Sequence, residues 1–411
     1  MVKHVIDNDQ TSTLSITSAG ESWIVNKGVS IDVVEHPGVF MSSSSDNSIF
    51  TVNGKISVTD PGQDNGDFAA LTSYGTDTFI SVGKSGTLAG ETGINLFGNG
   101  EELKNAGNIT GSRYGVHAIS DDLTITNNGT IANSLTGSGI EIFGDGNEIV
   151  NGKKGVISGL YGIHVAAEDG DKTVIINDGT IESGFFAPTA IKADDDSKSV
   201  EIVRNHGQIG GSVMLGGGKD LFDGRTGSVD GLVDGGDDND TYLVGAKSDY
   251  TISEQGGHGY DTIEAFTSVH IEDIDIEAVE LQGGQDLKAF ASSAGSYLRG
   301  NVGDNRLVGS IGEDTLGGGT GNDILKGGEG ADTFFFVTGW DKDVITDFHS
   351  GEDTLYIAGW SEIESFKDLK QHHLSEHNGN LIIQSGDDRL VLQGMDKSDL
   401  HHSDVDFSGF F

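Results

Sequence analysis

The chain of 411 residues has no cysteine and only three prolines, and none of its apolar runs is long. Without cysteine, no disulfide can stabilise the fold, and the redox compartment is left undetermined. No apolar run approaches the ~20 residues of a transmembrane helix, so no membrane span is expected. Residues 1–20 also lack the charged, apolar and small-residue progression of a secretory signal peptide, so any export is expected to use a different signal.

Basic residues are scarce as well, because 24 lysines and arginines stand against 65 aspartates and glutamates, a formal net charge of −41. Such a charge repels phosphate groups and argues against nucleic acid or an anionic membrane as the main partner. Self-repulsion of this size also disfavours a compact chain until something neutralises it. Bound cations are therefore expected.

A helical pattern is missing before residue 361, and short segments that alternate apolar and polar residues, such as "GIEIFG" and "SVEIVRN", take its place. Such segments are typical of strands. Between them a phrase recurs, Asn followed by Gly and then by Ile, Val or Leu, mostly every 22 to 28 residues, the length of a solenoid rung. Its copies begin at Asn26, Asn53, Asn105, Asn127, Asn151, Asn177 and Asn205. We predict a right-handed parallel β-helix whose corners use Asn and Gly because these residues tolerate left-handed backbone angles.

Later in the chain, the phrase Gly-Gly-x-Gly-x-Asp-x-apolar-x occurs twice in succession, from Gly318 and from Gly327, and two degenerate copies precede it in the same phase. The glycines predict tight turns with converging carbonyls, and the sixth position adds a side-chain oxygen. Hard oxygen donors without thiol or imidazole are the ligands that Ca²⁺ prefers. The candidate ligands and turn glycines are Asn305, Asp314, Asp323, Asp332, Gly309, Gly312, Gly318, Gly319, Gly321, Gly327, Gly328 and Gly330.

The nine-residue phrase resembles the Ca²⁺-binding nonapeptide of RTX (repeats-in-toxin) proteins, in which two units make one turn of a parallel β-roll. The resemblance implies that turns stacked on one side of the roll share a Ca²⁺ ion. Asp314 would then face Asp332 on one edge, and Asn305 would face Asp323 on the other. Because Asn305 carries no charge, its site is expected to be the weaker one.

A second group of Gly-Asp turns lies upstream, in "LGGGKDLFD", "GGDDNDTYL" and "GGHGYDTIE". Their sixth-position aspartates are neither nine nor eighteen residues apart, so no regular roll is expected there. The functional interpretation is an irregular calcium-binding segment of RTX type, and the alternative is a set of acidic turns on a solvated surface. The candidate ligands and turn residues are Asp220, Gly235, Gly236, Asp238, Asp240, Gly256, Gly257, Gly259 and Asp261.

The C-terminal region carries two further resemblances. Residues 331–359 resemble the segment that closes the roll in serralysin-type proteases, and Asp341 within it is another candidate ligand. The tail "DVDFSGFF" resembles the uncleaved signal of type I secretion, with Asp406 ahead of the terminal aromatics in 407–411. The zinc sequence of those proteases, His-Glu-x-x-His, is absent; "HLSEH" from His373 fits an inverted zinc motif, but we expect polar residues at the end of a short helix there.

An enzyme is the main alternative, since parallel β-helices include polysaccharide lyases and uronan epimerases. Its candidate residues are Arg113, Tyr114 and His117, with Tyr161 and His164 one to two rungs later. Their chemistry suits a uronate. Both groups, however, occupy equivalent slots of the repeat, as stacking alone would produce, and the acidic chain would repel a polyuronate. Ca²⁺-dependent release of unsaturated uronates from an acidic polysaccharide would identify an enzyme.

The sequence thus predicts an all-β chain with a β-helix over residues 1–212, an irregular calcium-binding segment over 213–283, an RTX β-roll over 284–360, and a C-terminal cap with a short helix, strands and the secretion signal over 361–411. We expect a secreted, extracellular or cell-surface bacterial protein, more readily non-enzymatic than enzymatic, that folds on Ca²⁺ outside the cell. The expected role is adhesion, matrix formation or host interaction. Expected partners are calcium ions, the type I secretion apparatus, and an extracellular polysaccharide or a host surface.

Replacing both Asp323 and Asp332 by alanine should weaken Ca²⁺-induced folding, because the double change removes one carboxylate from each edge of the roll. Circular dichroism during a Ca²⁺ titration measures the effect. The variant His373→Ala is the control and should titrate like the unchanged protein. A normal titration of the double variant, or a shifted titration of the control, would contradict the assignment of sites.

Overall fold

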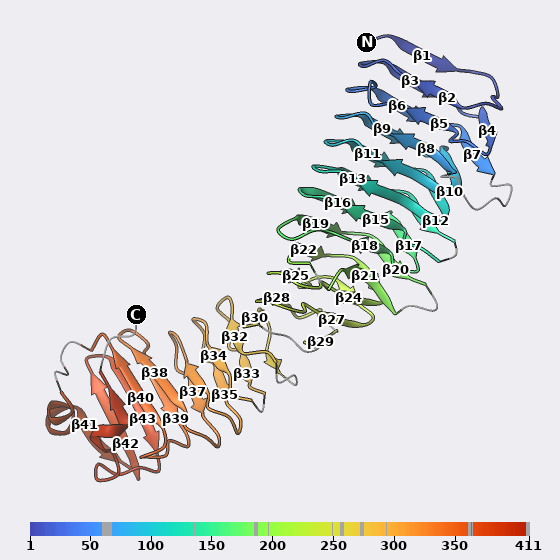
Figure 1. The fold of residues 1–411 in the computed structure, drawn as a ribbon. Helices are drawn as coiled ribbons and strands as arrows, with labels where there is room; N and C mark the ends of the chain where they lie inside the picture. The colour runs from blue at the N-terminus through green and yellow to red at the C-terminus, as the bar shows by residue number, and fades with distance from the viewer. Residues whose placement is uncertain are drawn as a thin grey trace. The chain divides into compact units, whose positions relative to one another are not determined.

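The computed structural model describes residues 1–411 except 60–67, 135, 185–187, 196, 249, 255–258, 272–274, 293, 361–362, 364 and 408–411. Internal contacts divide the chain into two units, Met1–Asp240 with Lys247–His258, and Thr241–Ala246 with Gly259–Phe411. Both units consist almost entirely of short parallel strands, which confirms the predicted all-β fold class (Figure 1). The finer division of the sequence at residues 212, 283 and 360 stays a prediction. Among the described residues, no helix is both long and apolar enough to cross a membrane.

The first unit is a parallel β-helix whose rungs place their strands in three ladders (Figure 1). The first ladder contains β1 (Lys3–Ile6), β3 (Ser22–Val25), β6 (Ile49–Val52), β9 (Phe79–Val82), β11 (Glu102–Asn105), β13 (Thr124–Asn127), β16 (Asn147–Asn151), β19 (Lys172–Asn177), β22 (Val200–Asn205) and β25 (Leu221–Asp223).

The other two ladders share two long strands, β10 (Thr87–Leu96) and β12 (Asn108–Ile119). The second ladder adds β4 (Ser30–Val34), β7 (Lys55–Thr59), β14 (Thr130–Asn133), β17 (Val156–Gly159), β20 (Thr180–Ser183), β23 (Gln208–Gly210) and β26 (Ser228–Val229). The third adds β2 (Leu14–Ile16), β5 (Val39–Met41), β8 (Ala69–Ser73), β15 (Ile140–Phe143), β18 (Ile163–Val165), β21 (Thr189–Ala193), β24 (Ser212–Met214), β27 (Leu232–Asp234) and β29 (Thr251–Ile252).

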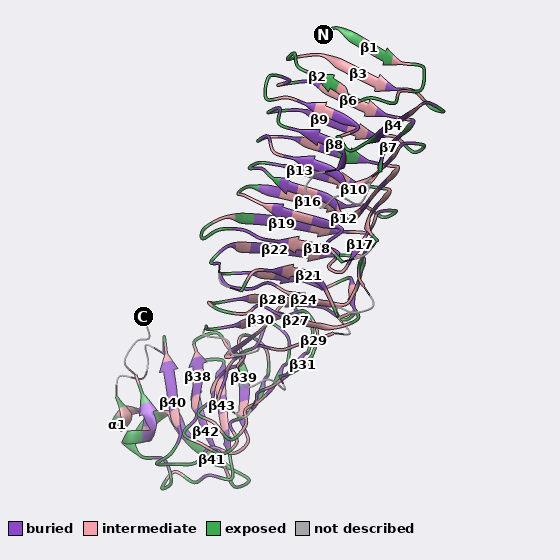
Figure 2. Cartoon of the chain, turned by 45° about the vertical axis from the view of Figure 1, so that its right-hand side comes forward, coloured by how far each residue is buried: buried purple, intermediate pink, exposed green. Residues whose placement is uncertain are grey.

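The core of the first unit consists of apolar columns, because inward side chains at register positions stack from rung to rung. Buried and half-buried residues alternate along the strands, as Figure 2 shows. One column is formed by Leu103, Ile125, Ile149, Ile175 and Val203, which are register partners and are fully buried. Burying such a side chain contributes about 1.5–3 kcal/mol, so the rungs have a core that needs no metal.

The repeated asparagines form a second interior column, at the last residue of successive strands of the first ladder. Asn105, Asn127, Asn151, Asn177 and Asn205 are at most 2% exposed. The amide nitrogen of each of the first four donates to the amide oxygen of the next, at 2.8–2.9 Å. The same nitrogens also donate to backbone carbonyls of the next rung, and the amide oxygens of all but Asn151 accept the N–H of the glycine two residues later.

The predicted left-handed angle at the corners occurs in the first copy, where Gly28 has a φ of 85°, but the prediction was wrong for the later copies. In the copies from Asn105 onward, neither the asparagines nor the glycines that follow them have a positive φ. Close approach of the rungs requires the glycines instead. A Cβ on Gly129 would overlap the carbonyl oxygen of Gly107, and a Cβ on Gly207 would overlap that of Gly179.

The second unit has two parallel sheets built from shorter strands. The first contains β28 (Thr241–Val244), β30 (Thr262–Ala265), β32 (Ala278–Leu281), β34 (Tyr297–Arg299), β36 (Thr315–Gly317), β38 (Thr333–Val337), β40 (Thr354–Ala358) and β44 (Val405–Asp406). The second contains β31 (Val269–His270), β33 (Lys288–Phe290), β35 (Arg306–Val308), β37 (Ile324–Lys326), β39 (Lys342–Ile345) and β43 (Asp388–Gln393), and continues antiparallel into β42 (Asn380–Ser385) and β41 (Leu374–His377).

Strands in the repeat region contribute little apolar surface to the core of the second unit. In β37, only the central Leu325 is buried, whereas Ile324 is 40% exposed. Leu307 and Leu316 are likewise the apolar residues that β35 and β36 bury. With about one buried apolar side chain in nine residues, burial falls short of the ordering cost of roughly 1–2 kcal/mol per residue. Another source of stability is required.

The C-terminal cap carries the described helices. A helical turn, α1 (Phe366–Asp368), continues into a π-helix, Leu369–His373, and a 3₁₀ turn spans His402–Asp404. The predicted short helix is therefore present. Strand β44 pairs with β40 and includes Asp406, so the predicted secretion signal begins within a sheet, whereas residues 408–411 lie outside the described part of the chain.

Replacing Asn127 by alanine should lower the free energy of unfolding of the first unit by about 2–4 kcal/mol, because several buried amide and backbone groups lose their partners. The adjacent Asn128 is exposed and is a matched control. The variant Asn128→Ala should change stability by at most about 0.5 kcal/mol. Urea unfolding in the presence of Ca²⁺ measures both, and equal losses would show that the asparagine column does not stabilise the rungs.

Candidate metal centre

The repeat region of the second unit stacks its sixth-position side chains in two columns, one for each sheet. In the first column, Asp314, Asp332 and Asp353 directly precede β36, β38 and β40. The Oδ1 atom of each accepts the backbone N–H of the column residue one turn earlier, at 2.6 Å from Ser296 to Asp314, 2.9 Å from Asp314 to Asp332, and 3.0 Å from Asp332 to Asp353. All three carboxylates are at most 4% exposed. The structure therefore places Asp314 and Asp332 on one edge.

The second column contains Asn305, Asp323 and Asp343. The Asn305 N–H donates to Oδ1 of Asp323 at 2.6 Å, and the Asp323 N–H donates to Oδ1 of Asp343 at 2.8 Å. The other oxygens of the two carboxylates, Asp323 Oδ2 and Asp343 Oδ2, are buried, and no other group among the described residues donates a hydrogen bond to them. Asn305 instead satisfies its amide locally, since its nitrogen donates to Oδ1 of Asn301 at 3.0 Å. The two unpartnered oxygens are the feature that most clearly requires a positive charge.

The glycines of the repeat leave space for these carboxylates. A Cβ on Gly318 would overlap Oδ2 of Asp323, and a Cβ on Gly327 would overlap Oδ2 of Asp332. The later glycines of each copy have a positive φ and lie against carbonyl oxygens of the turn below; they are Gly319, Gly321, Gly328 and Gly330. In the degenerate copies, a Cβ on Gly309 or on Gly312 would likewise overlap neighbouring atoms. Stacked turns therefore align backbone carbonyls beside the carboxylate columns.

The protonation of the columns follows from burial. Burial raises the pKa of Asp323 to about 7, that of Asp332 to about 7 and that of Asp343 to about 8, although backbone N–H donors act in the opposite direction. The pKa values of Asp314 and Asp353 are also raised, chiefly by burial. In the folded roll these groups therefore need either a proton or a cation near neutral pH.

Sequence reasoning missed three carboxylates of this region. Asp343 and Asp353 continue the two columns, and Asp347 accepts the N–H groups of Gly327 and Gly328, each at 3.0 Å. Asp343 and Asp353 lie 20 and 21 residues after their partners, so the extra residues break the nine-residue phase. An acid directly before a short apolar segment, as in "DVI" from Asp343 and "DTLYI" from Asp353, is the signal that would have found these two without a fixed phase.

Asp341, the ligand candidate of this segment, lies outside both columns. Its backbone has a positive φ of 62°, and its Oδ2 accepts the N–H of Gly321 at 3.4 Å. It therefore supports the turn of the repeat, and its charge also raises the pKa of Asp323 and Asp343.

The upstream candidates divide between the two units. In the first unit, the Glu201 N–H donates to Oδ1 of Asp220 at 2.7 Å, and the Asp220 N–H donates to Oδ1 of Asp240 at 2.7 Å. These residues repeat the column arrangement, with Glu201 missed by sequence reasoning. Burial raises the pKa of both Glu201 and Asp220, and the charge of Glu201 raises that of Asp220 further.

Other upstream candidates are turn residues. Gly235 is buried, and Gly236 has a φ of 98° and donates its N–H to Glu254 at 3.1 Å. Asp238 has a φ of 73° and forms an ion pair with Lys198 at 3.4 Å. These positions shape a turn of the first unit.

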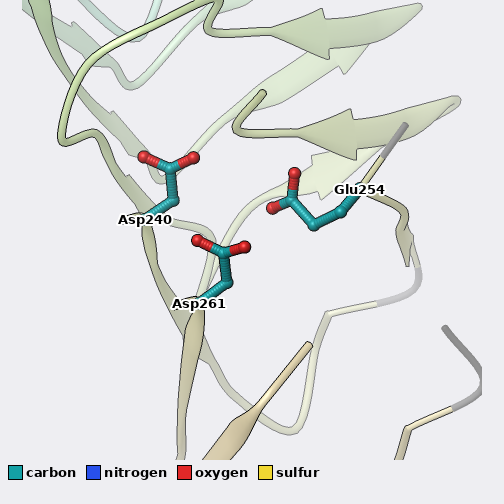
Figure 3. A group of neighbouring side chains, drawn as sticks. All are labelled: Asp240, Glu254 and Asp261. Carbon is teal, nitrogen blue, oxygen red and sulfur yellow. The ribbon is translucent and has the colours of Figure 1, made fainter. Parts of the chain in front are cut away.

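Asp261 belongs to the second unit, where it directly precedes β30 and its N–H donates to Glu277 at 2.7 Å. Gly259 is exposed, and the candidates Gly256 and Gly257 lie outside the described residues. Figure 3 shows Asp261 with Asp240 and Glu254, all three buried. Because the latter two belong to the first unit, we assign the three no common ligand.

The residues of the alternative enzyme interpretation form a row on the third ladder. Glu141, which sequence reasoning missed, lies between His117 Nδ1 at 3.0 Å and His164 Nδ1 at 3.2 Å, and His164 Nε2 contacts Asp194 Oδ1 at 2.9 Å. Tyr114 stacks on His117 with ring centroids 5.0 Å apart. Each of these contacts joins neighbouring positions of the ladder, as expected for side chains that stabilise adjacent rungs.

The inverted zinc motif does not form a helix. The π-helix ends at His373, and residues 374–377 form β41. His373 Nδ1 contacts the carbonyl of Gln384 at 3.1 Å, and Glu376 accepts the N–H of Lys397 at 2.8 Å. The expected polar helix residues are therefore partly wrong, because Glu376 and His377 lie in a hairpin strand.

Comparison with known proteins finds a family model that matches part of the second unit. The family model for the RTX calcium-binding nonapeptide repeat (4 copies) matches residues 298–335, which include Asn305, Asp314, Asp323 and Asp332 of the two columns but neither Asp343 nor Asp353. No curated protein matches the chain. Among solved structures, the chain is similar to the extracellular lipase LipA from Serratia marcescens, with 17% identity, a TM-score of 0.28, and coverage of 57% of this chain and 44% of the lipase. The chain thus spans less than half of that lipase, and the likeness carries no argument for function.

The residues of the two columns fit Ca²⁺. Their side-chain donors are all hard oxygens, and two buried oxygens accept no hydrogen bond from the part of the chain that the structure describes. The role of each named residue as a ligand stays a prediction.

His164 should make the stability of the first unit pH-dependent. Burial alone would lower the pKa of His164, but hydrogen bonds to Glu141 and Asp194 outweigh it and raise the pKa above 6.5. Burial would raise the pKa of Glu141, but its hydrogen bonds to His117, His164 and Tyr114 lower it to about 2. The His164 contribution is therefore complete below pH 6.5 and is lost as the pH rises through its folded pKa, whereas the Glu141 contribution is complete above pH 4.5 and is lost toward pH 2.

Urea unfolding of the first unit between pH 5.5 and 8.5 measures this effect. The variant His164→Gln should be less stable at pH 5.5 and should flatten the fall in stability at higher pH. His206 pairs with Asp178 at an exposed site, so His206→Gln is the control and should keep the profile. An unchanged profile in His164→Gln would rule out this histidine as its source.

Proposed function

We propose that the chain is a secreted Ca²⁺-binding protein of RTX type whose second unit folds when it meets Ca²⁺ outside the cell. The proposal rests on two buried oxygens, Asp323 Oδ2 and Asp343 Oδ2, to which no other group among the described residues donates a hydrogen bond. Asp323 lies within the matched repeats, and Asp343 follows them. In the absence of a cation, each has to be protonated or to bear an unfavourable buried charge.

Ca²⁺ supplies the positive charge that the columns lack when it binds. The chain's own residues prepare the position, because backbone N–H donors orient Oδ1 of Asp314, Asp323 and Asp332 and leave the second oxygen of Asp323 available. The glycines keep Cβ atoms out of the same space. Since the ligands converge only in the folded roll, Ca²⁺ binding is coupled to folding. Extracellular Ca²⁺ modules work at about 10⁻⁴ to 10⁻³ M, which favours folding after export.

We further propose that the first unit attaches the protein to an extracellular polysaccharide or a host surface. Its support is a row of aromatic rings on the third ladder. Phe40, Tyr74 and Phe97 follow one another with ring-centroid distances of 5.9 and 5.0 Å, and Tyr74 is 43% exposed. Aromatic faces of this kind bury apolar sugar faces while leaving hydroxyls in water. Truncating Tyr74 to alanine should reduce retention on a polysaccharide column, and unchanged retention would contradict this role.

With a chelator present, limited proteolysis should cut the second unit within the repeats and leave a resistant core from the first unit. Restoring millimolar Ca²⁺ should make both units resistant, because the apolar columns support the first unit and Ca²⁺ supports the second. Mass spectrometry of the fragments locates the cuts. Equal resistance of both units without Ca²⁺ would show that the repeats are structural turns.

Deletion of residues 407–411 should keep the protein inside a host that carries a type I secretion apparatus, without changing its Ca²⁺ affinity in vitro. The deletion spares Asp404, which is buried and accepts the N–H groups of Gly351 at 3.1 Å and His401 at 2.8 Å, so the cap is retained. Secretion is measured as the extracellular fraction against the full chain. Normal secretion would contradict a signal in this tail.

A further inference from the structure

Outside the repeats, the first unit contains a buried polar column where β19, β22 and β25 stack. Thr173 and Glu201 are register partners, and the Glu201 N–H donates to Asp220 at 2.7 Å. The exposed fractions of the three residues are 0%, 0% and 2%. In neighbouring columns the same strands carry apolar side chains such as Ile175, Val203 and Phe222. The three polar residues therefore interrupt an otherwise apolar interior.

Among the described residues, no other group donates to three oxygen atoms in this column, Thr173 Oγ1, Glu201 Oε1 and Asp220 Oδ2, although the Glu201 and Asp220 side chains contact each other. The second oxygen of Glu201 accepts from Ser199 Oγ at 3.2 Å, and Ser199 in turn contacts Ser197 at 2.9 Å. Among the described residues, no lysine, arginine or histidine forms an ion pair with Glu201 or Asp220. Two adjacent buried carboxylates and a hydroxyl thus lie in one column, to which the described residues supply no positive charge.

A lone carboxyl in an equivalent place shows the contrast. Glu101 directly precedes β11, is 1% exposed, and accepts a hydrogen bond from Thr78 at 3.1 Å. Glu101 Oε2 also lacks a partner, but among the described residues no second carboxylate stands next to it in the hydrogen-bonding chain, so a single proton on Glu101 leaves no buried charge. One proton shared by Glu201 and Asp220 still leaves a buried negative charge in the column, beside the hydroxyl of Thr173.

We propose that Thr173, Glu201 and Asp220 form a Ca²⁺ site inside the first unit. The side-chain donors are hard oxygens, two of them on carboxylates, which is the ligand type that Ca²⁺ prefers. Glu201 and Thr173 lie in strands without the glycine phrase, and the family match begins only at residue 298. The site therefore lies outside the matched repeats, although Asp220 belongs to the predicted irregular calcium-binding segment, and it stabilises the rungs around β22 without being needed for the earlier rungs.

Hydrogen exchange of the full-length protein, measured by mass spectrometry in Ca²⁺ and in chelator, tests the site. Peptides that cover β22 and β25 report on it, peptides from residues 314–353 report on the repeats, and peptides from β11 to β16 report whether the first unit is folded. At a free Ca²⁺ concentration about ten times the dissociation constant, exchange in β22 and β25 should slow by about tenfold. A change confined to residues 314–353 would overturn this site while leaving the repeat sites intact.

Two isosteric variants, Glu201→Gln and Asp220→Asn, should each abolish the Ca²⁺-dependent slowing in β22 and β25 and keep it in residues 314–353. Glu101→Gln is the matched control, a buried carboxyl of the first unit, and should keep both responses. Ca²⁺-dependent slowing that persists in both variants would overturn the proposal. The proposal would also be overturned if the slow exchange of β22 and β25 in the unchanged protein did not depend on Ca²⁺ but was lost between pH 6 and pH 9, after correction for intrinsic exchange. That result would identify a shared proton.

Discussion

The hydrogen bond from a backbone N–H to the side chain one rung later is the interaction on which both units depend. In the first unit it joins Leu123 to Asn147 at 2.9 Å and Glu201 to Asp220 at 2.7 Å. In the second unit it joins Asp314 to Asp332 at 2.9 Å. At each of these places the chain turns into a strand, and the side chain satisfies a donor that would otherwise be buried without a partner. A long stack of rungs can form because the same bond recurs along it.

The chemical nature of the side chain decides what else the stack needs. An amide both donates and accepts, so Asn127 can bond to Asn105 and Asn151 at once and the column is self-sufficient. An ionised carboxylate only accepts. A column such as Asp323 and Asp343 therefore ends in oxygens without donors and requires protons or cations. Exchange of amides for carboxylates turns a self-contained solenoid into one whose folding depends on its ionic environment.

The carboxylate columns contribute to the net charge of −41. Apolar columns such as Ile125, Ile149 and Ile175 give the first unit stability of its own, whereas repeat strands such as β37 bury a single leucine. Cation binding is therefore expected to contribute most to stability in the repeats, where apolar burial is weakest. The row of His117, Glu141 and His164 shows a third arrangement, in which imidazole nitrogens from two rungs contact a carboxylate on the rung between them.

The sequence by itself determined the strand character and the two kinds of repeat, because a fixed phase along the chain becomes a fixed stacking in space. The resemblance to the RTX nonapeptide, with two units per turn, implied the partners Asp314 with Asp332 and Asn305 with Asp323. The interior role of the asparagines was hidden, since a corner residue and a buried column residue follow the same spacing. Asp343, Asp353 and Glu201 were also hidden, because additional residues in the turns break the phase while the register between strands is kept. Glu141 acquires its two histidines only through rungs that lie 24 and 23 residues away along the chain. Which side chains share one column is set by strand pairing, and strand pairing is decided by the tertiary structure.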